Sequence, residues 1–224
     1  MRIGSLRSQN ASSAAIGSAI AVGLAGLLAA IFVVPGPLAG HMGLHIATMN
    51  VAAPLLALWI CARGWLDRSV ERSWMLWAAT LLQMALLWAW HSPPLQYASH
   101  TSPLFALGLH SALLLAAVVF WSTIIAGARP WQSIIALLLS GKLACLVGAL
   151  LVFSPRLLYA PICYGQSGNV DTVSALADQH LAGLIMLAAC PLSYVLAAIV
   201  LTTQEIASLP TLSASRRERH PVGG

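Results

Sequence analysis

The stretch from Pro103 to Ala126 reads PLFALGLHSALLLAAVVFWSTIIA, and its one ionisable side chain is His110. A helix that crosses the hydrocarbon core of a bilayer needs about 20 consecutive apolar residues, so this stretch predicts a transmembrane helix. Five further stretches have the same character, at about 14–34, 43–61, 74–90, 134–153 and 181–201. The sequence therefore predicts an all-α fold, a polytopic membrane helix bundle with about six transmembrane helices.

The overall composition agrees with a membrane protein. Hydrophobic residues make up 59% of the chain and charged residues 8%, and the mean hydropathy is +0.83, which leaves too little polar surface for a water-soluble globule. The net charge of +5 comes from short basic clusters between apolar runs, so we expect no nucleic-acid partner. The four cysteines form no CxxC pair, and we expect no disulfide framework.

The basic residues predict the orientation in a bacterial inner membrane. With the N-terminus in the cytoplasm, nine of the eleven obey the positive-inside rule. These nine are Arg2, Arg7, Arg63, Arg68, Arg72, Arg129, Arg216, Arg217 and Arg219. The exceptions are Arg156, just outside the fifth span, and Lys142, within it, where a functional and a snorkelling role both stay open.

Six spans place both termini in the cytoplasm. We expect a cytoplasmic segment at 1–13, the helix bundle at 14–201 and a tail without regular structure at 202–224. The alternative is that the first span is a signal peptide. Its apolar run exceeds the roughly 7 to 15 residues of a usual signal-peptide core, which favours a retained anchor.

Six of the seven histidines share the outer side in this topology: His41, His45, His91, His100, His110 and His180. His41 and His45 are four residues apart, so their imidazoles are neighbours on one helical face and can chelate one metal ion. No glutamate follows His41, so the base of an HExxH metalloprotease is missing. His100 lies in a polar loop, where we expect it to be solvated.

Sulfur ligands near the histidine pair favour copper. Met42 adjoins His41, and Met49 follows His45 by four residues; thioether and imidazole together suit Cu(I). The alternative is that both methionines only fill gaps between helices. Asp178 can cap the sixth helix, ligate the ion or orient an imidazole. The predicted metal ligands are His41, His45, His91, His110, His180, Met42, Met49 and Asp178.

Four blocks in order along the chain resemble CtaG-type cytochrome c oxidase assembly factors. They are His41-Met42-Gly43-Leu44-His45 with Ala53-Pro54-Leu55-Leu56, then Trp90-His91-Ser92-Pro93, then Phe153-Ser154-Pro155 with Leu158-Tyr159, and Asp178-Gln179 with Ala182-Gly183-Leu184-Ile185-Met186. The resemblance covers about residues 41–200. It implies an inner-membrane protein that helps to assemble a haem-copper oxidase and that supplies copper to it. Members of the family often carry a seventh helix and more aromatic residues after the last block, where this chain has Leu187 to Pro191.

Together these features predict a copper chaperone and not an enzyme. Neutral imidazole and thioether ligands suit an ion that is bound transiently at the periplasmic face and then released. The expected partners are a cytochrome c oxidase subunit, the lipid bilayer and a periplasmic copper donor. Three alternatives stay open: a b-type haem held by two histidines, a metal-free scaffold for oxidase assembly, and a di-iron oxygenase, which one HxxxH pair and few acids disfavour.

Overall fold

The computed structural model describes residues 36–64, 73–126, 129–159 and 171–219, without the side chains of residue 100 and residues 207–219. Within these ranges all regular structure is helical. The elements are α2 (Pro37–Ile46), η1 (Ala47–Ala52), α3 (Ala53–Ala62), α4 (Ser73–Trp90), α5 (Pro93–Thr101), α6 (Pro103–Ala126), α7 (Pro130–Phe153) and α9 (Thr172–Arg219). The predicted all-α class is confirmed.

Four helices of the described residues are long and apolar enough to cross a membrane: Pro37–Ala62, Pro103–Ala126, Pro130–Phe153 and Thr172–Ile206. The predicted third span corresponds to α4, which is not among these four; its 18 residues include Thr80, Gln83 and several tryptophans. The predicted first span lies outside the described residues. The bundle is therefore that of a multi-pass membrane protein, while the count of six spans and the orientation stay predictions.

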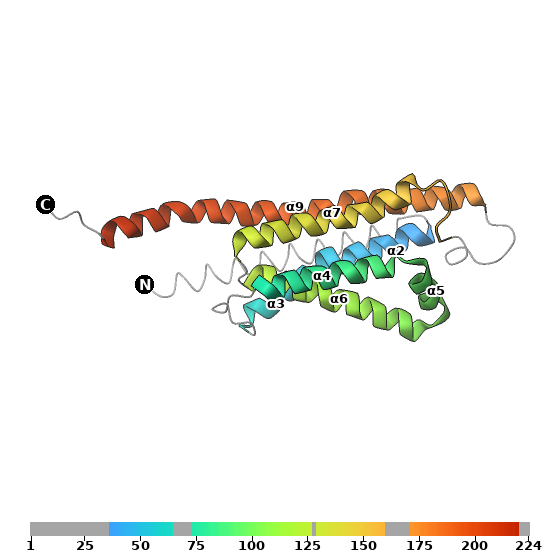
Figure 1. Ribbon diagram of the computed structural model, residues 1–224, viewed down its shortest axis with the longest axis horizontal. Coiled ribbons are helices and arrows are strands. Elements are labelled where there is room, and N and C mark those ends of the chain that lie inside the picture. Colours follow the sequence, from blue (N-terminus) through green and yellow to red (C-terminus); the bar gives the residue numbers. More distant parts are fainter. Residues whose placement is uncertain (1–35, 65–72, 127–128, 160–170, 220–224) are drawn as a thin grey trace, which may run out of the picture.

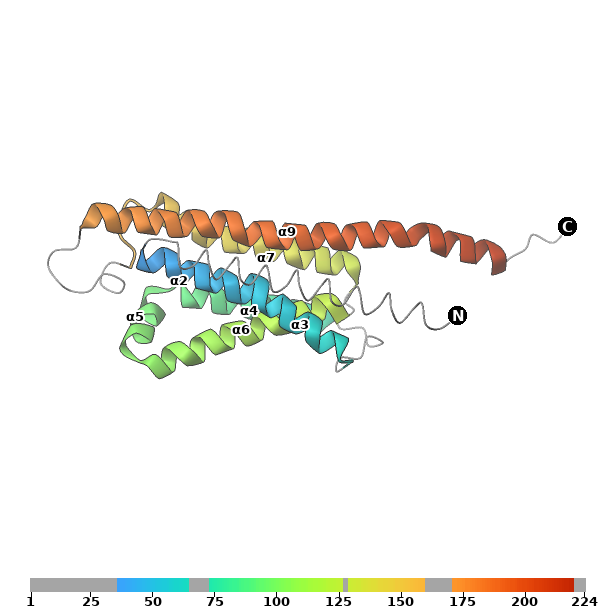
Figure 2. The same ribbon diagram turned by 180° about the vertical axis from the view of Figure 1, so that it is seen from behind.

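The helices alternate in direction, so the N-termini of α2, α6 and α9 meet the C-termini of α4 and α7 at one end of the bundle. This end also holds the short helix α5, which connects α4 to α6, and we call it the α5 end (Figure 1). Seen from behind, α9 runs along the whole bundle and past its opposite end (Figure 2). Every predicted histidine ligand lies on an element that reaches the α5 end.

Helices α7 and α9 make the most extensive contact of the bundle, and two glycines allow it. A Cβ atom added at Gly183 would lie 2.7 Å from the carbonyl oxygen of Gly148, and one added at Gly148 would lie 3.0 Å from that of Gly183. Small residues let backbones approach in this way inside membranes, where van der Waals packing drives helix association. Lys142 on α7 is exposed.

A proline produces the π-helix η1 between α2 and α3. Pro54 has no N–H to donate within the helix, and Ala53 N–H donates five residues back, to the carbonyl of Thr48. The Met49 carbonyl accepts instead a 3.0 Å hydrogen bond from Trp121 Nε1 on α6. A side chain from a neighbouring helix thus satisfies a backbone group that the proline would leave unpaired.

Candidate metal site at the α5 end

The helix that carries the predicted His41–His45 pair is capped by a carboxylate from another helix. Asp178 on α9 accepts hydrogen bonds from Leu38 N (2.9 Å) and Ala39 N (3.1 Å) in the first turn of α2. A negative charge at a helix N-terminus is stabilising because the backbone N–H groups and the helix dipole both favour it. Gly36 precedes this turn with a φ of 106°, and an added Cβ there would collide with the Asp178 carboxylate.

The expectation that Asp178 caps its own helix is wrong. Helix α9 begins at Thr172, so Asp178 lies in its second turn, too far from its N-terminus. Asp171 caps α9 instead, where its Oδ1 accepts a 3.1 Å hydrogen bond from Val173 N. The carboxylate of Asp178 therefore holds α2 in place, and its role as a ligand is left as a prediction.

Three imidazoles meet at the α5 end. One ligand atom each from His41, His45 and His110 lies within 4.8 Å of the other two. His41 and His45 are one turn apart on α2, with their Nε2 atoms 3.2 Å apart, and His110 comes from α6 with its ring centroid 5.3 Å from that of His45. Starting α2 at Pro37 places the pair inside the helix, one to two turns deeper than the predicted start at Gly43.

The spacing of the three nitrogens suits one ion after a small adjustment. Two nitrogens bound at about 2.0–2.1 Å to the same ion are at most about 4.2 Å apart, so side-chain movements of under about 1 Å suffice. His110 Nδ1 donates a 2.8 Å hydrogen bond to the carbonyl of Ala106. Since a neutral imidazole has one N–H, this bond leaves Nε2 of His110 with a lone pair for a metal.

His91 and Met42 form a second pair of donor atoms beside the three histidines. His91 Nδ1 donates to the Leu87 carbonyl at 2.7 Å, and its Nε2 faces Met42 Sδ at 3.4 Å. Burial lowers the pKa of His91 below its ordinary value, so the ring is neutral at pH 7 and both facing atoms carry lone pairs. Two acceptors cannot share a hydrogen bond, whereas a soft cation between them would bind both.

Trp90 packs against all three histidines of this cluster. Its ring centroid lies 4.2 Å from that of His110, 4.9 Å from that of His45 and 5.4 Å from that of His41, and the residue is 1% exposed. A membrane-interface tryptophan belt therefore does not account for Trp90, although it fits the exposed Trp88. In the sequence, only the position of Trp90 next to His91 could have indicated that it packs against the histidines.

Tyr159 is a second residue that sequence reasoning missed as a support of the site. Its hydroxyl donates a 2.7 Å hydrogen bond to the carbonyl oxygen of His91, and the residue is buried. The bond fixes the turn that follows α4, and with it the His91 ring. Tyr159 belongs to one of the four blocks that carry the family resemblance, and this was the one signal in the sequence that it matters for the site.

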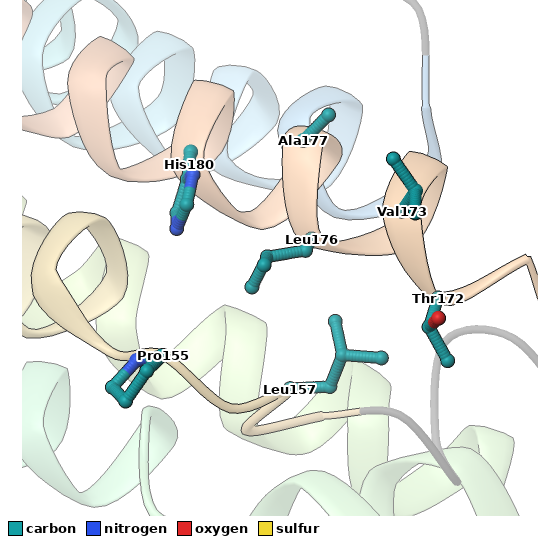
Figure 3. Close-up of a pocket in the computed structure, with 7 residues that line it drawn as sticks. All are labelled: Pro155, Leu157, Thr172, Val173, Leu176, Ala177 and His180. Atoms are coloured by element: carbon teal, nitrogen blue, oxygen red, sulfur yellow. The ribbon is translucent and has the colours of Figure 1, made fainter.

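The remaining predicted ligands lie elsewhere. The three-histidine group found among the described residues does not include His180, which lines a separate pocket of about 520 Å³ between α9 and the segment after α7 (Figure 3). Its other lining residues are Pro155, Leu157, Thr172, Val173, Leu176 and Ala177. Met49 lies deeper in the bundle, on η1. The structure thus brings His41, His45, His110, His91 and Met42 together.

Comparison with known proteins identifies the family of the chain. Residues 14–208 match the family described as cytochrome c oxidase caa3 assembly factor (Caa3_CtaG). No curated protein and no solved structure matches the chain. The match covers most of the 224 residues and all four sequence blocks noted above, so the chain belongs to the cytochrome c oxidase caa3 assembly factor family.

Proposed function

We propose that the protein binds Cu(I) at the α5 end and hands it to a subunit of a cytochrome c oxidase during assembly. The observation that supports this most is the convergence of His41, His45 and His110, from two helices, with one ligand atom each within 4.8 Å. Histidines that contacted only water and lipid headgroups would not be expected to lie this close to one another. Membership of an oxidase assembly family supplies the recipient.

The donor atoms favour copper over harder ions. Imidazole nitrogens and a thioether suit Cu(I), whereas Mg²⁺ and Ca²⁺ prefer carboxylate and carbonyl oxygens. The carboxylate of Asp178, on the helix next to α2, is engaged by the N-terminus of α2. Neutral ligands also permit release, because a carrier must lose its ion again and a closed cage of several thiolates would retain it.

The direction of delivery follows from the positive-inside rule. It assigns the α5 end to the periplasmic face of the inner membrane, where a periplasmic donor can load the site. A lateral contact between helices then presents the ion to the oxidase subunit within the bilayer. The protein needs no chemical step for this role, since ligand exchange alone moves the ion.

The haem alternative has less support from the geometry. A bis-histidine haem places its porphyrin between two imidazoles, whereas the three histidine rings here contact one another directly, with centroids 4.7 to 5.6 Å apart and the Trp90 ring packed against them. A reduced-minus-oxidised optical spectrum of the purified protein distinguishes the two functions. Haem bands would contradict the copper proposal.

The test is Cu(I) binding by the detergent-purified protein, measured anaerobically against a chromophoric Cu(I) chelator. We expect the double variant His41→Ala/His45→Ala to insert normally and to lose the ion held by the three histidines. His180→Ala is the matched control, because His180 lies at the same end of the bundle but lines another pocket. Unchanged Cu(I) binding in the double variant would refute the proposal.

A cellular assay separates copper delivery from a metal-free scaffold. In cells that lack the wild-type protein, the double variant should accumulate in the membrane and fail to restore an oxidase with its copper centres. Full oxidase assembly by a variant that no longer binds Cu(I) would favour the scaffold.

A further inference from the structure

A small cavity lies next to the histidine cluster, between η1, α4, α7 and α9. Its volume is about 20 Å³, close to the space that one water molecule or one small ion needs. Three sulfur-containing residues line it from two sides, Met49 on η1 and Met186 and Cys190 on α9. All three residues are buried, with exposed fractions of 5%, 2% and 7%.

The two methionines that line this cavity do not simply fill a gap between helices. A methionine side chain is flexible and usually closes irregular gaps in a core. Here two methionines border a cavity that stays open, next to a thiol that forms no disulfide. The π-helix η1 carries Met49 to this place, and π-segments inside α-helices occur frequently at functional sites.

His45 connects the cavity to the histidine cluster. The residue belongs to the three-histidine group and also lines the cavity. Its Nε2 lies 3.2 Å from His41 Nε2, whereas its Nδ1 is buried and has no hydrogen-bond partner among the described residues. An unpaired buried nitrogen costs free energy unless a ligand satisfies it, so an unpaired nitrogen on a residue that lines the cavity points to a bound species.

We infer that Met49, Met186 and Cys190 form a second Cu(I) site, to which the ion passes through His45. The inference rests on the proposed function for the identity of the ion. On binding, the Cys190 thiol loses its proton to solvent and a Cu(I)–sulfur bond forms, with no change of oxidation state. A thiolate neutralises the single charge of Cu(I), whereas a divalent ion would leave a net charge in the membrane interior, which is costly.

The test compares stoichiometry and spectra of the full-length protein titrated with Cu(I) alone. We expect two ions per chain and the ultraviolet charge-transfer absorption of a Cu(I)–thiolate bond. The triple variant Met49→Leu/Met186→Leu/Cys190→Ser should bind one ion and lack this absorption. His41→Ala/His45→Ala should keep the absorption and bind one ion.

Two further variants keep the test decisive. Cys61→Ser is the control, because Cys61 is an equally buried thiol on α3 away from the cavity, and it should behave as the wild type. If the triple variant does not fold, Met186→Leu alone conserves side-chain volume and should weaken the second ion roughly tenfold.

The possible failures are distinguishable. One ion per chain, lost with the two histidines and unaffected by the sulfur variants, would overturn the second site and leave the proposed function standing. Binding lost only in the sulfur variants would overturn the histidine site and leave the inferred one. Absence of the thiolate absorption in the wild-type protein would contradict the inference directly.

Discussion

Two contacts in this bundle are built from opposite kinds of side chain. Helices α7 and α9 meet through Gly148 and Gly183, where almost no side chain separates the backbones. Helices α2, α4 and α6 meet at the α5 end through imidazoles and the Trp90 indole, which are large, polar and partly without hydrogen-bond partners. The first contact gives rigidity, and the second brings donor atoms together.

The difference indicates how stability and binding are divided in the molecule. Close backbone packing in a membrane contributes stability without any polar group. A cluster of imidazoles around an indole contributes donors, and it depends on the rest of the bundle to hold them together. The link between the two regions is Asp178, which belongs to α9 and caps α2. Substitutions in each region should therefore separate effects on stability from effects on Cu(I) binding.

The largest effect is expected at the glycine contact. Gly183→Leu would force α7 and α9 apart, because an added Cβ already meets the Gly148 carbonyl at 2.7 Å. We expect a loss of about 3 kcal/mol in the free energy of unfolding, measured by detergent denaturation in mixed micelles. Gly108→Leu on α6 is the control, since nothing lies within 4 Å of its added Cβ. Equal stability of the two variants would contradict the role of the glycine contact.

The next largest effect is expected at Asp178, which connects α9 to α2. Asp178→Ala leaves the N–H groups of Leu38 and Ala39 without their carboxylate, and the loss of hydrogen bonds to a charged group costs about 2 kcal/mol. Cu(I) affinity should fall roughly tenfold as well, because α2 carries His41 and His45. Asp171→Ala, at the exposed start of α9, should leave the affinity unchanged. A stability loss with full affinity would show that the site does not depend on this cap.

A smaller effect is expected at the π-helix. Trp121→Phe keeps the aromatic packing but removes the donor to the Met49 carbonyl, and an unpaired buried carbonyl costs about 1 to 2 kcal/mol. Trp131→Phe, an exposed tryptophan at the start of α7, is the matched control. Thermal unfolding of both proteins in the same detergent measures the difference, and equal midpoints would mean that the Met49 carbonyl finds another donor.

The sequence predicted the helices well because their signal is local. The stretch Pro103–Ala126 coincides with α6, and the four-residue spacing of His41 and His45 correctly placed them as neighbours. Hydropathy does not show where a capped helix begins, so the start of α2 at Pro37 was missed. The cap that fixes this start comes from Asp178, more than a hundred residues away, and no local pattern reports such a contact.

The composition of the site was only partly predictable for a similar reason. Helical spacing shows which residues of one helix share a face, but not which faces of different helices meet. His110 and His180 were both predicted to join the His41–His45 pair, and the packing brings in only the former. Trp90 could not be recognised as part of the cluster because aromatic residues at a helix end fit a membrane interface equally well.

The smallest effect separates binding from stability most cleanly. Met42→Leu conserves volume at a fully buried position, so we expect a change in unfolding free energy of under about 1 kcal/mol. The Sδ that faces His91 Nε2 at 3.4 Å is lost, and Cu(I) affinity should fall roughly fivefold, or about 1 kcal/mol. Met84→Leu is the control, since Met84 is also buried, on α4 outside the cluster. Because both variants make the same exchange of a thioether for a branched aliphatic side chain, equal affinities of these variants would mean that Met42 packs against His91 without sharing its ion.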